Sequence, residues 1–204
     1  MKHGSLLRGI LASILIGLVS PAAAQTPGTC VVTRVEGQAF VSARGAGVRS
    51  AVTGLGLGRN AKLRTDAGGR ITMTCSGGLD VVVGPESEVD VIGLLDGGAR
   101  PFGLRLIDGI AGFLFSSDEE NGVQVRTPSA VAAVRSTQWA MRVENRASAI
   151  FARTGMVFVV TDDDDARLGP GDGVDVTPSG EIGPVTPWGQ ARIDRFGALL
   201  GPDW

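Results

Sequence analysis

The residue types that most often carry out catalysis or bind metal ions are scarce in this sequence. The only histidine is His3, which lies in an N-terminal leader that we expect to be removed. The rest of the chain therefore lacks the base of Ser-His and Cys-His relays and the imidazole that zinc sites favour. It also contains no G-x-S-x-G elbow and no Walker loop. These observations argue against an enzyme, and we expect no cofactor.

Paired carboxylates could still hydrolyse a glycosidic bond without a histidine. Glu86 and Glu88 flank a turn, and Asp118–Glu120 is a second acidic run. Both sets are typical of solvated loops, so an enzyme that uses carboxylates alone is only the third hypothesis for function.

The densest charge cluster is Asp162–Asp165. Calcium takes six to eight oxygen ligands, and four successive carboxylates could supply some of them. The run lacks the alternating spacing and the glycine of a calcium loop. We interpret it as the water-facing tip of a hairpin.

Arginine and tryptophan could form a binding site instead. Arg135 and Trp139 lie four residues apart and could contact a ligand or anchor an interface. The interpretation we favour is that Trp139 fills the core and Arg135 pairs with an acid. Trp188 and Trp204 are better candidates for interface residues, because they belong to a tail that could dock on the domain or on a partner.

Residues 1–24 have the pattern of a secretory signal peptide. Lys2 and Arg8 make the start positive, the apolar run Ile10–Val19 follows, and Ala22–Ala24 supplies the small residues of a cleavage site. The apolar run is shorter than the roughly 20 residues of a membrane span. We expect cleavage after Ala24 and a periplasmic or secreted protein of a Gram-negative bacterium without a stable span; an uncleaved signal anchor is the alternative.

Export bears on both the charge and the cysteines of the mature chain. Removal of Lys2 and Arg8 from a chain with 19 basic and 21 acidic residues leaves a net charge of −4, which argues against a nucleic-acid partner. In an oxidising compartment we favour a disulfide between Cys30 and Cys75, and two buried free thiols are the alternative.

Short runs of alternating or β-branched residues separated by glycine turns predict about fourteen strands. Among them are Leu104–Ile107 and Ile110–Phe115, divided by a turn at Asp108-Gly109, and Ala149–Phe151 and Met156–Val160. Such spacing indicates an all-β domain, either a β-solenoid or a sandwich, over residues 25–184.

Residues 185–204 form the one stretch that looks helical. We expect a helix over Pro187–Leu200, with Thr186 as its cap and Pro187 as its first residue. Its apolar stripe would consist of Ala191, Phe196 and Leu199-Leu200.

The order of these motifs resembles the FecR-type periplasmic domain. Residues 57–91 resemble its first half. This segment includes a leucine-glycine turn, and its last motif is Gly84–Glu88. Residues 125–139 resemble its most specific stretch, Thr127-Pro128 followed by an Ala/Val run and an Arg-Gly-Thr-like triplet. Residues 155–160 and 168–171 resemble its closing strand and turn. Two positions differ, since Ser136 replaces glycine and Asn60 replaces aspartate.

The resemblance implies an all-β sensor module on the far side of the inner membrane. Signalling members carry an anti-sigma segment and a membrane helix before this domain, and we expect neither here. We therefore expect a non-enzymatic interaction or sensing module that binds a protein or glycan partner in the envelope. The alternative is a structural envelope protein that self-assembles or binds peptidoglycan.

Overall fold

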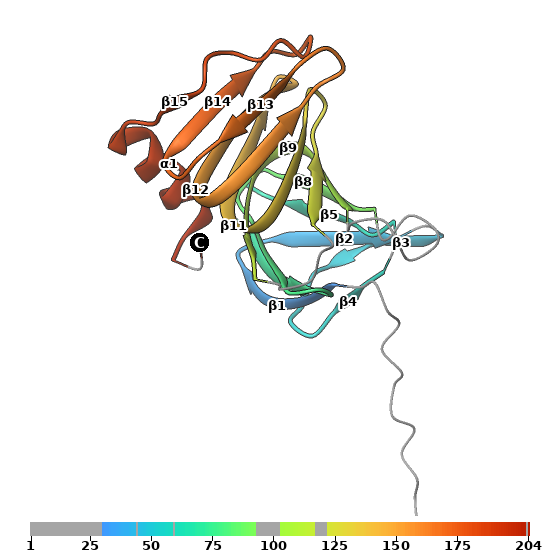
Figure 1. Cartoon of the computed structure of the whole chain (residues 1–204). Helices are drawn as coiled ribbons and strands as arrows, with labels where there is room; N and C mark the ends of the chain where they lie inside the picture. Colours follow the sequence, from blue (N-terminus) through green and yellow to red (C-terminus); the bar gives the residue numbers. More distant parts are fainter. Residues whose placement is uncertain (1–29, 44, 59, 93–102, 117–121, 203) are drawn as a thin grey trace, which may run out of the picture.

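The structure is a computed structural model that describes residues 30–43, 45–58, 60–92, 103–116, 122–202 and 204. The leader at residues 1–24 and the acidic run Asp118–Glu120 lie outside the described residues. Within them, strands predominate and only the C-terminal segment is helical (Figure 1). The predicted all-β class and the single short C-terminal helix are therefore confirmed.

All strands belong to one continuous sheet. They are β1 (Cys30–Glu36), β2 (Ala39–Ala43), β3 (Ala46–Ser50), β4 (Gly56–Leu57), β5 (Lys62–Thr65), β6 (Arg70–Cys75), β7 (Leu79–Val83), β8 (Glu88–Val91), β9 (Gly103–Phe115), β10 (Val123–Arg126), β11 (Val131–Glu144), β12 (Ala147–Val160), β13 (Asp165–Leu168), β14 (Asp172–Val176) and β15 (Thr186–Pro187). The helix α1 (Gln190–Leu200) follows them.

The sheet folds over on itself into two layers that share three long strands. One layer, here called the capped layer, runs in the order β4-β1-β6-β7-β9-β11-β12-β14-β15. The other, here called the open layer, runs in the order β3-β2-β5-β8-β9-β10-β11-β12-β13. Strands β9, β11 and β12 pass from one layer to the other. Of the two architectures expected, this is the sandwich.

A change of phase in the side-chain alternation marks the bend in β9. In its first half Leu104 and Leu106 face the core, whereas after Gly109 the residues that do so are Phe113 and Phe115. Gly109 has φ +84, a conformation that side chains with a Cβ rarely adopt. The expected turn at Asp108-Gly109 is therefore a bend inside one strand, and the division into two strands was wrong.

The other two shared strands bend in the same way. The β11–β12 register shifts between Arg135 and Trp139, and Gly155 has φ +69 in the middle of β12. The runs that the sequence separates at these points are continuous strands, because neighbouring strands hold both halves in hydrogen-bonded ladders.

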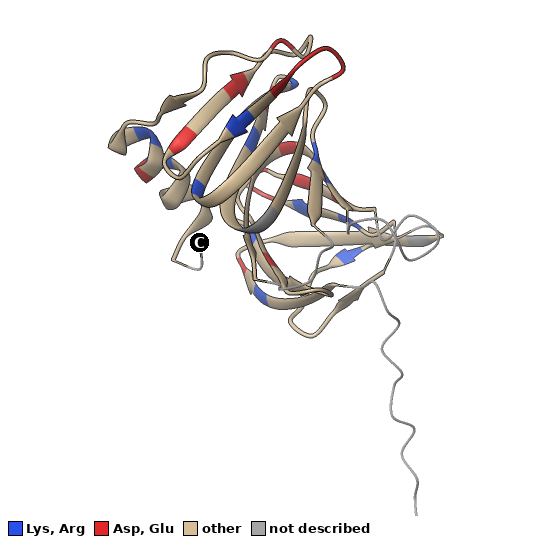
Figure 2. Ribbon diagram, viewed as in Figure 1, with Lys and Arg blue, Asp and Glu red and all other residues tan. Residues whose placement is uncertain are grey.

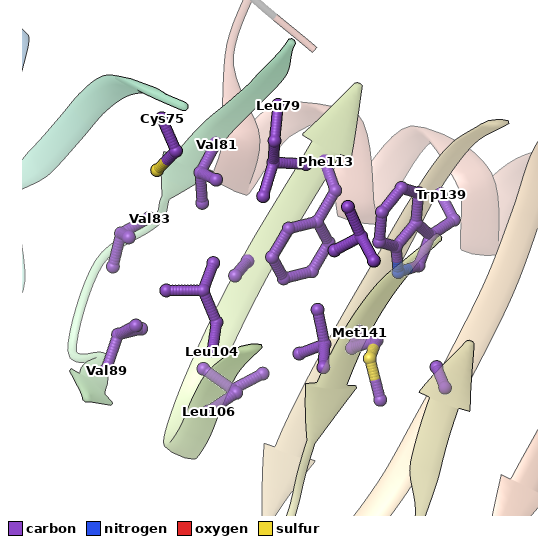
Figure 3. Close-up of a cluster of buried hydrophobic side chains, with 14 of the residues drawn as sticks. Cys75, Leu79, Val81, Val83, Val89, Leu104, Leu106, Phe113, Trp139 and Met141 are labelled. Carbon is purple, nitrogen blue, oxygen red and sulfur yellow. The ribbon is translucent and has the colours of Figure 1, made fainter. Parts of the chain in front are cut away.

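The core lies between the two layers and is mostly aliphatic. Its largest aromatic contact is a stacked pair, Phe113 and Trp139, with ring centroids 4.8 Å apart. Figure 3 shows these two rings among Leu79, Leu104 and Met141, which come from both layers. Full burial of side chains of this size contributes about 1.5–3 kcal/mol each.

The tail differs in part from the expected helix. Thr186-Pro187 is extended and pairs with Asp172 and Gly173 as an edge strand of the capped layer. Helix α1 begins at Gln190, its N-cap is Gly189, and no side chain caps it. The prediction that Thr186 caps the helix at Pro187 is wrong, because the sheet pairing continues through these two residues. No helix among the described residues is long and apolar enough to span a membrane.

Candidate binding face

The two cysteines form a disulfide, as favoured from the sequence. Cys30 on β1 and Cys75 on β6 are register partners on neighbouring strands. Both are buried. The bridge joins two strands of the capped layer and is structural.

Trp139 lies in the core and is 0% exposed, which agrees with the interpretation favoured from the sequence. The main chain of Arg135 pairs with Met156 on β12; the side chain of Arg135 lies outside the described part of the chain. Among the described side chains, Trp139 and Arg135 therefore do not form a binding site.

Trp188 and Trp204 pack on the capped layer, and each is 8% exposed. Trp188 stacks on Phe151 with ring centroids 5.0 Å apart. The indole Nε1 of Trp204 donates a hydrogen bond to the backbone oxygen of Trp139, at 3.0 Å. Of the two docking modes expected for the tail, docking on the domain is the one that the structure shows.

The tail covers the outer face of the capped layer. Phe196 and Leu200 of α1 join Trp188 and Trp204 over a second apolar cluster, whose sheet residues are Val82, Ile110, Ala140 and Phe151. In Figure 1 the red tail, with α1, lies along one side of β12 and β14. The tail therefore occupies the middle of this face, over β7, β9, β11 and β12, and leaves Leu114 40% exposed.

The outer face of the open layer carries a row of side chains that crosses seven strands. Strand registers place the members of this row next to one another from β5 to β13. In order they are Lys62, Asp90, Arg105, Arg126, Val131, Val160 and Asp165.

Two arginines stand side by side in the middle of this row. Arg105 on β9 and Arg126 on β10 are partners in the parallel pairing of these strands, and both are exposed. Asp90, on the other side of Arg105, is paired with Lys62 at 3.4 Å. Within the described ranges, neither Arg105 nor Arg126 forms an ion pair.

An apolar patch borders the arginines. Phe158 and Val160 on β12 are 45% and 44% exposed, and the half-buried Val131 lies between Val160 and Arg126 in the row. Charged and apolar groups thus adjoin on one face, a combination typical of protein-binding surfaces.

A cavity of about 750 Å³ opens beside the arginine pair. Among the residues that line it are Arg105, Ile107, Arg126, Ser129, Val160 and Thr161. This volume lies within the range of about 300–1,000 Å³ that is usual for ligand pockets.

A hydroxyl network fixes the turn that follows Arg126. The Ser148 hydroxyl donates to Thr127 Oγ1 at 2.7 Å and lies 2.6 Å from the Ser129 hydroxyl. Thr127 Oγ1 also accepts from the backbone N–H of Ala130 at 2.9 Å. Ser148 and Ser129 are buried. The Thr-Pro-Ser stretch therefore supplies the framework beside the cavity.

The remaining acidic candidates lie in turns or at the strand ends beside them, and Glu88, the first residue of β8, is half-buried. Glu86 is exposed, has φ +49 and occupies the turn between β7 and β8. Asp162–Asp164 forms the exposed tip of the β12–β13 hairpin and Asp165 begins β13, which confirms the expected hairpin; the tip is red in Figure 2. Among the described residues no group of three or more His, Cys, Asp or Glu side chains is arranged to hold a metal ion.

Sequence reasoning missed Arg105 and Arg126. They lie 21 positions apart on strands whose parallel pairing and register no sequence pattern reveals. The nearest signal is that Arg126 directly precedes the Thr-Pro motif.

Comparison with known proteins supports the resemblance seen in the sequence. Residues 61–158 match the family model described as FecR protein. No curated protein matches the chain. Of the strands outside the matched range, β1, β2, β13 and β14 pair with strands inside it. Strands β3, β4 and β15 pair with β2, β1 and β14 and continue the same sheet.

Two solved structures share the fold. Both are crystal structures, at 1.65 Å and 2.50 Å resolution, of what is described as "a putative anti-sigma factor" from Parabacteroides distasonis ATCC 8503. Each has a TM-score of 0.56 and 20% sequence identity over 65% of this chain. The chain spans 62% of the length of that protein. The likeness to these structures concerns the fold alone; the family match identifies residues 61–158 as a FecR domain.

Proposed function

We propose that this chain is an exported, non-enzymatic interaction module of the FecR type that binds a partner protein through the outer face of the open layer. The observation that carries the proposal is the contrast between the two layers. The tail covers much of the outer face of one, while the other carries two arginines that form no ion pair with a described residue and lie next to an exposed apolar patch. The signalling role of FecR-type proteins favours recognition over catalysis.

Export is supported by two independent features. The leader has the charge, length and cleavage site of a signal peptide. The Cys30–Cys75 bridge is of a kind that persists in oxidising compartments and is rare in the cytosol. We therefore place the mature chain, from Gln25, in the periplasm or outside the cell.

Self-assembly is the second candidate function. Strand β3 pairs only with β2 and is an edge of the open layer, and Val48 on it is 74% exposed. An exposed apolar edge strand is a template for pairing with another chain. This observation favours a second copy at that edge.

Site-specific crosslinking in the producing cell tests both candidates. A benzophenone amino acid replaces Phe158 on the open layer in one variant. In the control it replaces Leu114 on the capped layer, which is similarly exposed at 40%. We expect a discrete crosslinked species from position 158 and none from position 114.

The other outcomes are equally informative. No adduct from position 158, or equal adducts from both positions, would contradict recognition by the open layer. An adduct with twice the mass of the chain, obtained with the benzophenone at Val48, would support self-assembly. Sedimentation of the chain with purified cell wall would instead indicate peptidoglycan binding.

A further inference from the structure

We propose that Arg105 and Arg126 bind a carboxylate of an extended, acidic segment of the partner protein. The inference rests on the proposed function and names the chemistry of the partner at that same face. It identifies the arginine pair as the polar recognition element and the apolar patch of Val131, Phe158 and Val160 as its neighbour.

The first argument is electrostatic. Register partners on neighbouring strands lie about 4.8 Å apart along the hydrogen-bond direction, and like charges there repel each other. Arg105 and Arg126 occupy such positions. An anion between them would remove the repulsion, and guanidinium groups bind carboxylates in a planar, bidentate geometry.

Two described carboxylates beside the pair, Asp90 and Asp162, do not fill this role. Asp90 follows Arg105 in the row but is paired with Lys62 at 3.4 Å. Asp162 lines the same cavity from the tip of the β12–β13 hairpin. Neither lies within 4 Å of a guanidinium nitrogen of Arg105 or Arg126 in the described part of the chain. Among the described residues, the arginine pair therefore has no carboxylate partner and can take an external anion.

The spacing of the apolar patch sets the shape of the ligand. Val131 is one strand from Arg126 and Val160 is two strands away, so Val160 lies about 10 Å from Arg126 across the sheet. An extended peptide in the polyproline II conformation advances about 3.1 Å per residue with three residues per turn, so side chains three positions apart lie on the same side, about 9 Å from each other. A segment that crosses the strands can thus place an acidic side chain on the arginines and an apolar side chain, three positions away, on Val160.

The aromatic residues favour a peptide over a glycan. All three tryptophans are at most 8% exposed, and the sequence has no tyrosine. Phe158 is the exposed aromatic ring of this face, and the Arg167 guanidinium lies over it at 5.5 Å from the ring centroid. An open aromatic platform on which a sugar could stack is therefore absent from the described part of this face.

Titration of the purified, processed chain by nuclear magnetic resonance tests the proposal. The probe is a capped hexapeptide, acetyl-Ser-Glu-Ser-Thr-Val-Ser-amide, and the matched control peptide has glutamine in place of glutamate. With the glutamate peptide we expect the amide signals of Arg126, Val131 and Val160 to shift together.

Charge removal gives the decisive comparison. The glutamine peptide cannot form charge-assisted hydrogen bonds to the arginines, so it should bind about tenfold more weakly or worse. The double variant Arg105→Gln/Arg126→Gln should lose affinity to the same extent. Arg195→Gln, an exposed arginine on α1, should bind like the unaltered chain. The amide spectrum of each variant verifies that it is folded.

Several binding results would overturn the proposal. Among them are equal binding of the two peptides, no shift at millimolar glutamate peptide, and tighter binding of an oligogalacturonate, which would identify an acidic glycan. Binding of acetate as tight as that of the peptide would show an adventitious anion only.

The crosslinking experiment separates this inference from the proposed function. If the benzophenone at position 158 crosslinks as strongly in the double variant as in the chain with both arginines, the proposed function stands and this inference fails. If Phe158 does not crosslink in the unaltered chain, the proposed function itself fails.

Discussion

The Trp204 indole nitrogen donates a hydrogen bond to the backbone oxygen of Trp139, 65 residues earlier in the chain. The Trp139 ring lies on the opposite side of β11, stacked on Phe113 in the core. One strand residue thus connects the core to the tail on the outer face. The guanidinium of Arg153 adds a second contact, because it donates to the backbone oxygen of Trp204 at 2.8 Å and lies over its ring.

Replacement of Trp204 should therefore destabilise the whole domain. For Trp204→Ala we expect the free energy of unfolding to fall by about 3–5 kcal/mol, because a buried indole and its contacts are lost. Trp204→Phe keeps most of the apolar contact and loses the hydrogen bond, which is worth about 1 kcal/mol. Urea denaturation followed by circular dichroism measures both. An unchanged midpoint for Trp204→Ala would show that the tail does not contribute to stability.

Gly112→Ala tests the same contact from the side of the sheet. A Cβ at Gly112 would overlap the Trp204 ring, at a separation that no real Cβ contact shows. We expect the substitution to displace the tail, to quench or shift tryptophan fluorescence, and to destabilise the domain by about 1–3 kcal/mol as an overpacked site. Gly58→Ala is the matched control, because a Cβ at Gly58 meets nothing within 4 Å. Equal effects of the two substitutions would contradict the proposed packing.

Local patterns in the sequence predict most strands of this fold but not their continuity. The turn residues Asp108-Gly109 indicate two strands. The first half has a burial period of two, whereas the second half is buried on both sides except at Leu114. The structure keeps them as one strand, since β8 and β10 pair with the first half and β7 and β11 with the second. Such pairing depends on tertiary context, which no local pattern contains.

The candidate site is less predictable for a related reason. The Thr127-Pro128 motif is visible in the sequence, and so is the arginine before it. The partner of that arginine, Arg105, is brought beside it only by the parallel register of β9 and β10. The tryptophans attract attention by their type, yet the tail and the core bury them.

Reduction of the Cys30–Cys75 bridge should lower stability without changing the fold. The sequence separation of 45 residues corresponds to about 4 kcal/mol in the chain-entropy model. We expect a Cys30→Ser/Cys75→Ser variant to unfold at lower urea concentration and to keep its circular dichroism spectrum in buffer. Addition of a reductant should lower the midpoint of the unaltered chain and leave that of the variant unchanged. A reductant-insensitive midpoint for the unaltered chain would show that the bridge does not form.

Thr127→Val should weaken the framework beside the arginine pair. Valine has nearly the shape of threonine but cannot accept the hydrogen bonds from Ser148 and from the N–H of Ala130. Buried donors left without partners cost about 1–3 kcal/mol, and we expect the free energy of unfolding to fall by that amount.

Thr33→Val is the matched control for this substitution. Thr33 is exposed, and its hydroxyl donates one bond, to the Thr72 backbone oxygen at 3.1 Å. Exposed substitutions of this kind usually change stability by less than about 0.5 kcal/mol. Because Arg126 directly precedes Thr127, the Thr127→Val variant should also bind the glutamate peptide less tightly than the Thr33→Val variant does. Equal stability and equal peptide affinity of the two variants would show that the hydroxyl network neither supports the turn nor positions the arginine.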